Sequence, residues 1–589
     1  MHVIATAGHV DHGKSTLVRA LTGKDPDRLE EEHRRGLSIE LGYVWTDLDD
    51  VGEVAFVDVP GHERFISTML AGIGPVPAVL LVVAADDPWM PQAAEHLAAL
   101  DALGVSHGVV AVSRADLSDP APMVARAEAE IAGTSLRGSP VVPVSGHTGE
   151  GLDELRRHLV ETVRSLPLPD PEADVRLWVD RRFTIKGAGT VVTGTLPAGT
   201  VRRGDTLSVD GASLRVRGVQ SLGRDADSAT GVARVALNLA GDDLGTLERG
   251  SVLVSAGAWH HTDLVDVRVS PGRDATALPP ERPLLHIGAT SVATHARPLS
   301  DDLARLRLDR PLPLRVGDRA LLRDPGSREV WGVTVLDPMP PALRRRGAAA
   351  KRAKVLATVE GPHLAGEVAR RGLVAVDDLR RIGVPADPEA PPAGAVHAAG
   401  WLMSEERAAA TAAAVSAAVT EHERTSPLAN GLPLTVLAER LGLPTVDLVR
   451  AVVSPPLRVE AGRVTSGRSA VLPEAVQRAV DRARKDLEAD PFAAPTADRL
   501  REIGLDDKAA AAAAKAGLLL RPAPGIVLLP GSDRLAAAWL AELPQPFTTS
   551  EARQRLGTTR RVVLPLLEHL DRTGLTRRLP DDRREVTGA

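Results

Sequence analysis

The chain has 589 residues, of which 43% are hydrophobic and 25% are charged, and its formal net charge is −6. This length predicts about four domains, and the charge excludes a uniformly basic nucleic-acid binder while leaving room for local basic patches. The chain has no cysteine, which excludes disulfides, thiolate metal sites and a catalytic thiol. Because no apolar run is long enough to cross a membrane and no charged leader precedes the first strand, we expect a cytoplasmic protein without a membrane partner.

The first expected element is a buried strand at Val3–Ala7, followed by the glycine-rich loop Gly8–Ser15 and a helix that starts near Thr16. The loop matches the pattern Gly-x-x-x-x-Gly-Lys-Ser/Thr, which binds phosphates. Its glycines let backbone N–H groups close on the phosphates, and the helix N-terminus adds a favourable dipole. The pattern predicts a triphosphate site, with the ammonium of Lys14 at the β- and γ-phosphates and the hydroxyl of Ser15 on Mg²⁺.

Two further segments are expected to reach the same phosphates. Asp58 lies in the apolar run 54–59, where it can bind Mg²⁺ through water, and Gly61 leaves its amide free to meet a γ-phosphate. The segment Arg35–Glu40 lies between the two motifs, where a first switch segment is expected, and its Ser38 would supply a second hydroxyl. The expected metal ligands are Ser15, Ser38 and Asp58.

The base of the nucleotide is expected to meet two later loops. Ser113–Asp116 follows a strand at 108–112 and stands where guanine specificity is read, and Val144–Gly149 follows another strand and would close over the base. The carboxylate of Asp116 can accept from N1 and N2 of guanine, which rejects adenine. The expected nucleotide-binding residues are Asp11, His12, Gly13, Lys14, Ser15, Thr16, Asp58, Gly61, Ser113, Arg114, Asp116, Ser145 and Gly146.

The whole chain divides by pattern into four regions. Alternating strand-like and helix-like runs predict an α/β domain at residues 1–170. Short alternating segments rich in Gly and Pro predict two β-barrels, at 174–258 and 260–340. Helix–turn–helix patterns, each followed by a β-like segment, predict winged helices in series at 345–589. The expected fold class is multidomain: an α/β P-loop GTPase domain, two β-barrels and an α-rich tandem winged-helix region.

The motifs Gly-His-Val-Asp-His-Gly-Lys-Ser and Asp-Val-Pro-Gly-His-Glu, in this order, resemble the translational GTPases. The resemblance implies that His62 is catalytic and orients the attacking water, behind an apolar gate of Val10 and Ile39. No arginine in the chain is evident as an activating group, so the ribosome would complete the site. The expected reaction is hydrolysis of GTP to GDP and phosphate with Mg²⁺.

Three positions depart from the usual pattern of this group. Ser113-Arg114-Ala115-Asp116 stands where Asn-Lys-x-Asp is usual, so we expect GTP to bind with loosened affinity. Ser38 replaces a threonine and keeps the hydroxyl. Gly146 replaces an alanine, which contributes to nucleotide binding mainly through its backbone.

The stretch Asp180–Thr195 resembles the second domain of the selenocysteine-specific elongation factors, as do Arg35–Tyr43, Asp58–Phe65 and Leu564–Arg572. The resemblance covers essentially the whole chain. It implies a monomer that delivers selenocysteinyl-tRNA to the ribosome at recoded UGA codons. The alternatives are a general translational GTPase, which carries ordinary or initiator tRNA, and a non-catalytic RNA adaptor that uses the nucleotide only as a structural ligand.

The cargo pocket is expected to be cationic, because a selenol is largely ionised at neutral pH whereas the hydroxyl of serine is not. The resemblance points to Asp180, Arg181 and Arg234 as this pocket. Two opposite charges about 4 Å apart gain roughly 4 kcal/mol at an effective dielectric near 20, less the desolvation of both groups. The alternative is a barrel-surface ion pair of little energy.

The C-terminal unit carries an arginine cluster at the start of a candidate recognition helix and around a short wing. The family binds a stem-loop of the selenoprotein mRNA with this region, and such a cluster could hold the phosphates of a hairpin. The expected RNA-binding residues are Arg560, Arg561, Arg577, Arg578, Arg583 and Arg584. The alternative is a solvated charged face, because acidic residues are interleaved and aromatic platforms are absent.

Overall fold

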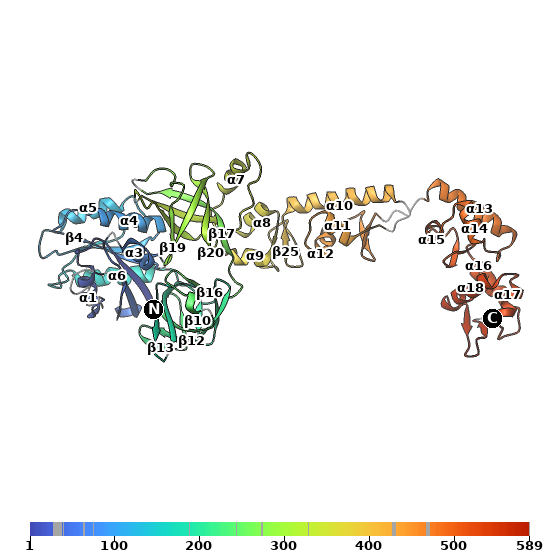
Figure 1. Cartoon of the computed structure of the whole chain (residues 1–589), viewed down its shortest axis with the longest axis horizontal. Coiled ribbons are helices and arrows are strands. Elements are labelled where there is room, and N and C mark those ends of the chain that lie inside the picture. The colour runs from blue at the N-terminus through green and yellow to red at the C-terminus, as the bar shows by residue number, and fades with distance from the viewer. Residues whose placement is uncertain are drawn as a thin grey trace. The chain divides into compact units, whose positions relative to one another are not determined.

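The chain is described by a computed structural model. It covers residues 1–26, 38, 40–62, 65–74, 76–187, 189–242, 244–272, 275–327, 329–426, 431–466 and 472–587. These residues form two compact units, 1–392 and 393–589, which are described separately (Figure 1). No helix within the described ranges is long and apolar enough to cross a membrane.

The first domain is a six-stranded sheet in the order β2-β3-β1-β4-β5-β6, in which only β2 runs antiparallel to its neighbour. The strands are β1 (His2–Ala7), β2 (Gly42–Asp47), β3 (Glu53–Asp58), β4 (Ala78–Ala84), β5 (His107–Ser113) and β6 (Val141–Pro143). Every residue of β4 is buried, because apolar clusters cover both faces of the sheet. The helices are α1 (Lys14–Thr22), α3 (Ile66–Ile73), α4 (Pro91–Leu103), α5 (Ala121–Ile131) and α6 (Leu152–Ser165). The loops after the parallel strands therefore meet at one edge, where ligands bind in such sheets.

The second domain is an antiparallel β-structure around its own apolar core. Its main sheet has the order β7-β16-β11-β12-β15-β9-β8, with β13 paired to β12, and β10 pairs separately with β14. The strands are β7 (Arg176–Trp178), β8 (Arg181–Ile185), β9 (Gly189–Leu196), β10 (Thr200–Arg202), β11 (Thr206–Val209), β12 (Ala212–Ser221), β13 (Arg224–Ala226), β14 (Ser228–Thr230), β15 (Ala233–Ala240) and β16 (Val252–Ser255). Burial alternates along β15, as expected for a strand with one face toward a core.

The third domain is a closed barrel in the order β17-β20-β19-β18-β21-β22, and the indole of Trp331 is fully buried inside it. Its strands are β17 (His261–Pro271), β18 (Leu284–Ile287), β19 (Thr290–Pro298), β20 (Leu303–Pro313), β21 (Arg319–Arg323) and β22 (Val330–Asp337). The remaining elements of this unit are α7 (Ala348–Leu356), α8 (Leu364–Arg371), β23 (Leu373–Ala375) and α9 (Val376–Arg381).

A buried ionic network joins α7 and α8 to the third domain. Arg352 of α7 donates to Asp266 of β17 at 2.7 Å, and Arg371 of α8 donates to Asp337 at 2.6 Å. Both carboxylates are fully buried. Arg370 and Arg352 also donate to the carboxylate of Asp337. Breaking such a pair is costly, since it leaves a buried charge without compensation; the network therefore fixes these helices against the barrel.

Within its described residues, the second unit contains three helix pairs, each followed by a two-stranded wing: α11–α12 with β27–β28, α14–α15 with β29–β30, and α17–α18 with β31–β32. Its helices are α10 (Glu405–Thr425), α11 (Leu434–Arg440), α12 (Val446–Val452), α13 (Glu474–Ala489), α14 (Ala497–Ile503), α15 (Asp507–Lys515), α16 (Ser532–Ala541), α17 (Thr549–Arg555) and α18 (Arg560–Arg572). Its strands are β24 (Val396–Ala398), β25 (Trp401–Met403), β26 (Leu432–Pro433), β27 (Arg458–Glu460), β28 (Arg463–Thr465), β29 (Leu520–Ala523), β30 (Ile526–Leu528), β31 (Thr576–Arg578) and β32 (Arg584–Val586). The expected multidomain fold class is confirmed.

Candidate functional site

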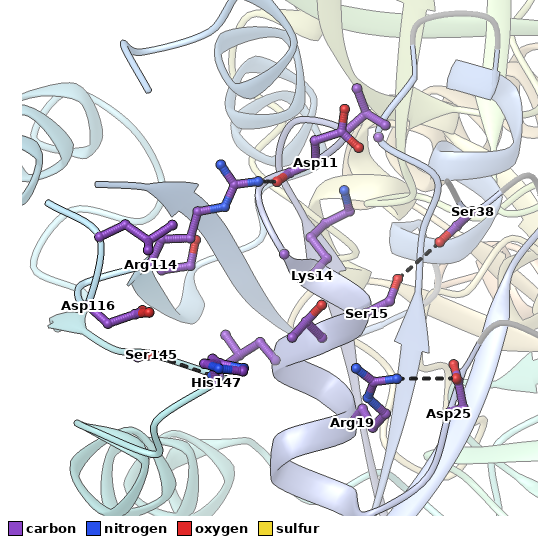
Figure 2. Close-up of a pocket in the computed structure, with 18 residues that line it drawn as sticks. Asp11, Lys14, Ser15, Arg19, Asp25, Ser38, Arg114, Asp116, Ser145 and His147 are labelled. Atoms are coloured by element: carbon purple, nitrogen blue, oxygen red, sulfur yellow. Dashed lines mark hydrogen bonds and ion pairs between the residues drawn. The ribbon is translucent and has the colours of Figure 1, made fainter. Parts of the chain in front are cut away.

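A cavity of about 610 Å³ opens at the edge of the first domain where the strands end (Figure 2). The cavity is lined by Val10, Asp11, Gly13, Lys14, Ser15, Thr16, Leu17, Arg19, Asp25, Ser38, Gly61, Ser113, Arg114, Asp116, Leu117, Ser145, Gly146 and His147. Every residue predicted to bind nucleotide is therefore in the lining except His12 and Asp58. The residues that the motifs missed include Arg19 and Asp25, whose charged groups are 3.7 Å apart.

The phosphate loop requires glycine at two positions. Gly8 has φ +130°, and a Cβ there would lie 2.0 Å from the carbonyl oxygen of Val82. Gly13 has φ +79° and precedes the first residue of α1, Lys14. Glycine adopts this left-handed backbone conformation at little energetic cost. It turns the chain into the helix so that the N-terminus of α1 faces the cavity, where an anion is favoured.

Three oxygen-bearing side chains from distant segments meet at one side of the cavity. The hydroxyl of Ser15 donates to Asp58 Oδ2 at 2.6 Å, and its oxygen is 3.1 Å from Ser38 Oγ. Thr6 orients the same carboxylate, since its hydroxyl donates to Asp58 Oδ1 at 2.6 Å and accepts from the amide of Val59 at 3.1 Å. Hydroxyl and carboxylate oxygens are the ligands that Mg²⁺ prefers, together with phosphate and water. These residues therefore fit a magnesium ion.

Gly61 lies directly against the phosphate loop. A Cβ at this position would be 2.4 Å from the amide nitrogen of Val10 and 2.6 Å from Lys14 Nζ. Only glycine fits this approach without displacing the loop. Lys14 Nζ donates to the carbonyl oxygen of His9 at 2.8 Å, so its ammonium is held over the loop. The chain that follows β3 can therefore respond to what Lys14 binds.

His62, the predicted catalytic residue, is half-buried and does not line the cavity. Its ring packs beside the ring of Phe65, with centroids 6.0 Å apart. Val10, one half of the predicted gate, does line the cavity, whereas Ile39 lies outside the described residues. The motif identified the loop that carries His62, but the position of the ring depends on the conformation of that loop, which a γ-phosphate would alter.

The atypical guanine motif contacts the phosphate loop. The hydroxyl of Ser113 donates to the carbonyl oxygen of His12 at 2.6 Å and is 3.2 Å from that of Val83. Arg114 has φ +57°, pairs with Asp86 at 3.1 Å and donates to the carbonyl oxygen of Asp11. Its guanidinium therefore extends along the loop (Figure 2).

The end of the cavity that is predicted to read the base carries an exposed carboxylate. Asp116 is exposed, and a hydrogen bond with Ser145 lowers the pKa of its carboxyl group, so the group stays ionised as an acceptor. Ser145 Oγ accepts from the amides of His147 at 3.2 Å and Thr148 at 3.0 Å, which fixes the loop. A Cβ at Gly146 would be 3.4 Å from Thr16 Cγ2, so alanine also fits there.

Two histidines of the phosphate loop, His9 and His12, and a third from α4, His96, lie close to one another. The amide of Gly8 donates to Nδ1 of His96 at 2.9 Å, and the rings of His9 and His12 meet edge to face with centroids 4.9 Å apart. Burial lowers the pKa of His96 to about 3 and that of His12 to about 4. Both rings are neutral at pH 7, so they add no charge to that of Lys14. The fully buried ring of His12 explains why it does not line the cavity.

The predicted cargo-pocket residues lie together where the first and second domains meet. Arg234 Nη2 donates to Asp180 Oδ1 at 2.8 Å, and this carboxylate also accepts from the hydroxyl of Thr193 at 2.8 Å. Tyr43, from β2 of the first domain, was not predicted from the motifs. Its hydroxyl donates to Asp180 at 3.3 Å, and the guanidinium of Arg234 lies 3.8 Å from the centre of its ring.

Arg181 is held by the first domain. It forms an ion pair with Glu40 at 3.1 Å and donates to the carbonyl oxygen of Leu41. Its guanidinium carbon is 5.3 Å from the centre of the Tyr43 ring. Both arginines are thus engaged with carboxylates. Spacing within one domain could not reveal this, because Glu40 and Tyr43 reach the pocket from another domain.

The arginines of the C-terminal unit differ in exposure. Arg560 is exposed at the start of α18, whereas Arg561 donates to the carbonyl oxygen of Ala494 at 2.8 Å. Arg584 is 5% exposed and donates to Asp571 at 2.9 Å. The wing pairs are Arg577–Glu585, Arg578–Asp582 and Arg583–Asp581. Arg584 is therefore a packed residue of the wing, and the other wing arginines have neighbouring carboxylates.

Three segments of the chain match family profiles. Residues 1–165 match the elongation factor Tu GTP binding domain. Residues 273–342 match the selenocysteine-specific elongation factor β-barrel domain, and residues 538–584 match the winged helix of elongation factor SelB.

Comparisons with individual proteins also find similarity to translation elongation factors. The chain is 37% identical to the selenocysteine-specific elongation factor of Desulfomicrobium baculatum over 64% of its own length and 63% of that protein. It is 33% identical to elongation factor Tu 2 of Streptomyces avermitilis over 56% of its own length and 95% of that protein. A crystal structure of a bacterial selenocysteine-specific elongation factor, EF-Sec, is similar over 100% of both chains, with a TM-score of 0.76 and 25% identity. The match to the Desulfomicrobium protein thus spans under two thirds of its length.

Proposed function

This chain belongs to the selenocysteine-specific elongation factors, a family of translational GTPases, and we propose on that basis that it delivers selenocysteinyl-tRNA to the ribosome at recoded UGA codons. It does so with GTP bound and hydrolyses GTP to GDP and phosphate when the ribosome activates it. The observation that carries the proposal is that one compact unit combines the cavity at Lys14 with the Asp180, Arg181 and Arg234 cluster.

In the nucleotide site, Lys14 binds the β- and γ-phosphates, and Asp116 reads the guanine. Mg²⁺ would be held by Ser15, Ser38 and Asp58, and when bound it neutralises phosphate charge. Thr6 keeps the carboxylate of Asp58 turned toward Ser15. His62 orients the attacking water once its loop has moved toward the γ-phosphate, and the ribosome drives this rearrangement.

Selection of the cargo rests on charge. A selenolate is an anion and serine is not, so a guanidinium near the aminoacyl group favours selenocysteine. The two arginines of the pocket lie close together, as the Cζ atoms of Arg181 and Arg234 are 5.3 Å and 3.8 Å from the centre of the same Tyr43 ring.

The second unit is proposed to bind the stem-loop of the selenoprotein mRNA, with its exposed arginines on the phosphates. Arg560 is the leading contact, because it is exposed at the N-terminus of α18 and none of the ion pairs found in the described residues involves it. Arg577, Arg578 and Arg583 can exchange their carboxylate partners for phosphates. Such contacts make the affinity fall steeply with salt.

The test is a comparison of selenocysteinyl-tRNA with seryl-tRNA of the same tRNA sequence, measured as protection of the aminoacyl ester with GTP, with GDP and without nucleotide. We expect strong protection of selenocysteinyl-tRNA with GTP alone and weak protection of seryl-tRNA. Equal protection of the two would instead support the general translational GTPase, which the similarity to elongation factor Tu 2 favours. A lack of ribosome-stimulated GTP hydrolysis would support the RNA adaptor.

A further inference from the structure

A run of basic residues around the start of α7 lies outside the nucleotide site, the proposed cargo pocket and the winged helices. Residues 338–359 contain six arginines and lysines and no aspartate or glutamate, although the whole chain has a net charge of −6. One of the six, Arg352, is buried and bonds to Asp266 and Asp337. The other five are exposed and are called the α7 cations below: Arg344, Arg345, Arg346, Lys351 and Lys354.

The α7 cations have no counter-charge. None of their side chains forms an ion pair or a hydrogen bond with any residue that the structure describes. The wing arginines differ in this respect, since Arg577 and Arg578 donate to carboxylates. Lys351 lies in the first turn of α7, which has no acidic residue, and the N-terminal end of a helix dipole disfavours cations. The stability of the fold therefore does not account for these charges.

α7 presents its cations from a fixed position. The bonds of Arg352 and the apolar contacts of the buried face hold the helix against the barrel of the third domain (Figure 1). Lys351 and Lys354 are three residues apart, so they share the opposite, exposed face. The chain before the helix is also tied to the barrel, because the carbonyl oxygen of Pro341 accepts from Arg305 at 2.9 Å.

The chemistry of this surface fits a ligand with several phosphates. The planar guanidinium of arginine binds phosphate oxygens through two parallel hydrogen bonds, and the ammonium of lysine adds a point charge. A lipid surface fits less well, because a membrane-binding helix exposes an apolar face. The apolar face of α7 is buried, and none of the large apolar side chains exposed among the described residues lies in residues 338–359. The surface therefore matches the backbone of a nucleic acid.

We propose that the α7 cations bind the phosphate backbone of the cargo tRNA, away from its aminoacyl end. The inference rests on the proposed function. The cargo pocket and α7 lie in the same compact unit, residues 1–392, so a tRNA whose aminoacyl end is in the pocket has its other phosphates confined near this unit. A second contact within one complex adds affinity without a second cost of association. The pocket then selects the amino acid, and the α7 cations strengthen binding whichever amino acid is attached.

The test removes three of the α7 cations in the full chain by the combined substitutions Arg344→Gln, Arg345→Gln and Arg346→Gln. Affinities for selenocysteinyl-tRNA and seryl-tRNA are measured with GTP at several salt concentrations. We expect both affinities to fall by the same factor, roughly ten- to hundredfold at low salt, and the slope of log affinity against log salt to become shallower by roughly 2 to 3. Substitution of the same three arginines by lysine keeps the charge and should preserve most of the affinity.

A charge-matched control is the combined substitution Arg157→Gln, Arg164→Gln and Arg380→Gln. These side chains are about as exposed as one another, at 55%, 53% and 53%, and each already has a carboxylate within 4 Å. The control loses the same total charge but no unpaired cation, so both tRNA affinities should stay unchanged. An equal loss in the control would mean that net charge alone is responsible, and it would overturn the inference.

Three further outcomes would also overturn it. They are unchanged affinity for both tRNAs in the α7 variant, a loss confined to ribosome-stimulated GTP hydrolysis, which would assign the surface to ribosomal RNA, and a loss confined to the mRNA hairpin. The proposed function is tested separately by the unaltered chain. If that chain fails to prefer selenocysteinyl-tRNA over seryl-tRNA, the proposed function fails, whatever the α7 variant shows.

Discussion

At the scale of single residues, His62, which is proposed to be catalytic, lies outside the lining of the cavity. Gly61 touches the phosphate loop, whereas His62, the next residue, packs beside Phe65. The resemblance assigns His62 the positioning of water, and the geometry separates this role from nucleotide binding. The two functions should therefore be separable by substitution.

We expect His62→Ala to lower ribosome-stimulated GTP hydrolysis about 10²- to 10⁴-fold, the usual contribution of a side chain that handles the proton of an attacking water. GTP affinity should not change, because His62 does not line the cavity. Single-turnover hydrolysis with ribosomes and equilibrium binding of GTP measure the two effects. Equal loss of both would mean that His62 supports the fold of the site instead.

At the scale of elements, buried charge fixes α7 and α8 to the third domain. Burial by itself would raise the pKa of the carboxyl group of Asp337, but the guanidinium groups of Arg370, Arg371 and Arg352 outweigh this effect and hold the pKa at about 2. The helices therefore depend on a carboxylate that must remain ionised. This junction lies within the first compact unit.

Asp337→Asn should destabilise the first unit by about 3 kcal/mol, because three arginines lose a buried counter-charge. The pKa of Asp337 is depressed from 3.8 to about 2 on folding, so its contribution is complete above pH ~4 and is lost as the pH falls through about 2. Thermal unfolding of both proteins between these values should show a steeper loss for the unaltered chain. Parallel pH profiles would contradict the assignment.

At the scale of the whole molecule, the chain separates into a unit with the nucleotide site and the proposed cargo pocket, residues 1–392, and a unit with the winged helices, residues 393–589. The charged pairs that form the pocket all lie in the first unit. The arginines proposed to bind the mRNA hairpin all lie in the second. Binding of selenocysteinyl-tRNA and binding of the mRNA hairpin should therefore be separable by truncation of the chain.

A chain of residues 1–392 should bind GTP and selenocysteinyl-tRNA with affinities close to those of the full chain, and should lose binding of the mRNA hairpin. The reason is that each compact unit has apolar cores of its own, so each can fold alone. Filter binding with the two RNAs measures both effects, and circular dichroism confirms folding. Retained hairpin binding by the shortened chain would assign the hairpin to the first unit.

The sequence by itself determined the chemistry that depends on local spacing. The phosphate loop, Asp58 and Asp116 follow from motifs, because each motif places its residues at the end of a strand and parallel strands end at one edge. The resemblance to the selenocysteine-specific elongation factors, inferred from these motifs and from Asp180–Thr195, is confirmed.

Only the tertiary structure decided what lies between the domains. Glu40 reaches Arg181 and Tyr43 reaches Asp180 although about 140 residues separate each pair in sequence. No periodicity in the sequence indicates which residues meet across such a separation. Likewise, Arg584 is indistinguishable in sequence from its exposed neighbours, and only packing against Asp571 buries it. Sequence specifies which groups a strand or loop carries, but the charge that each group faces depends on long-range packing.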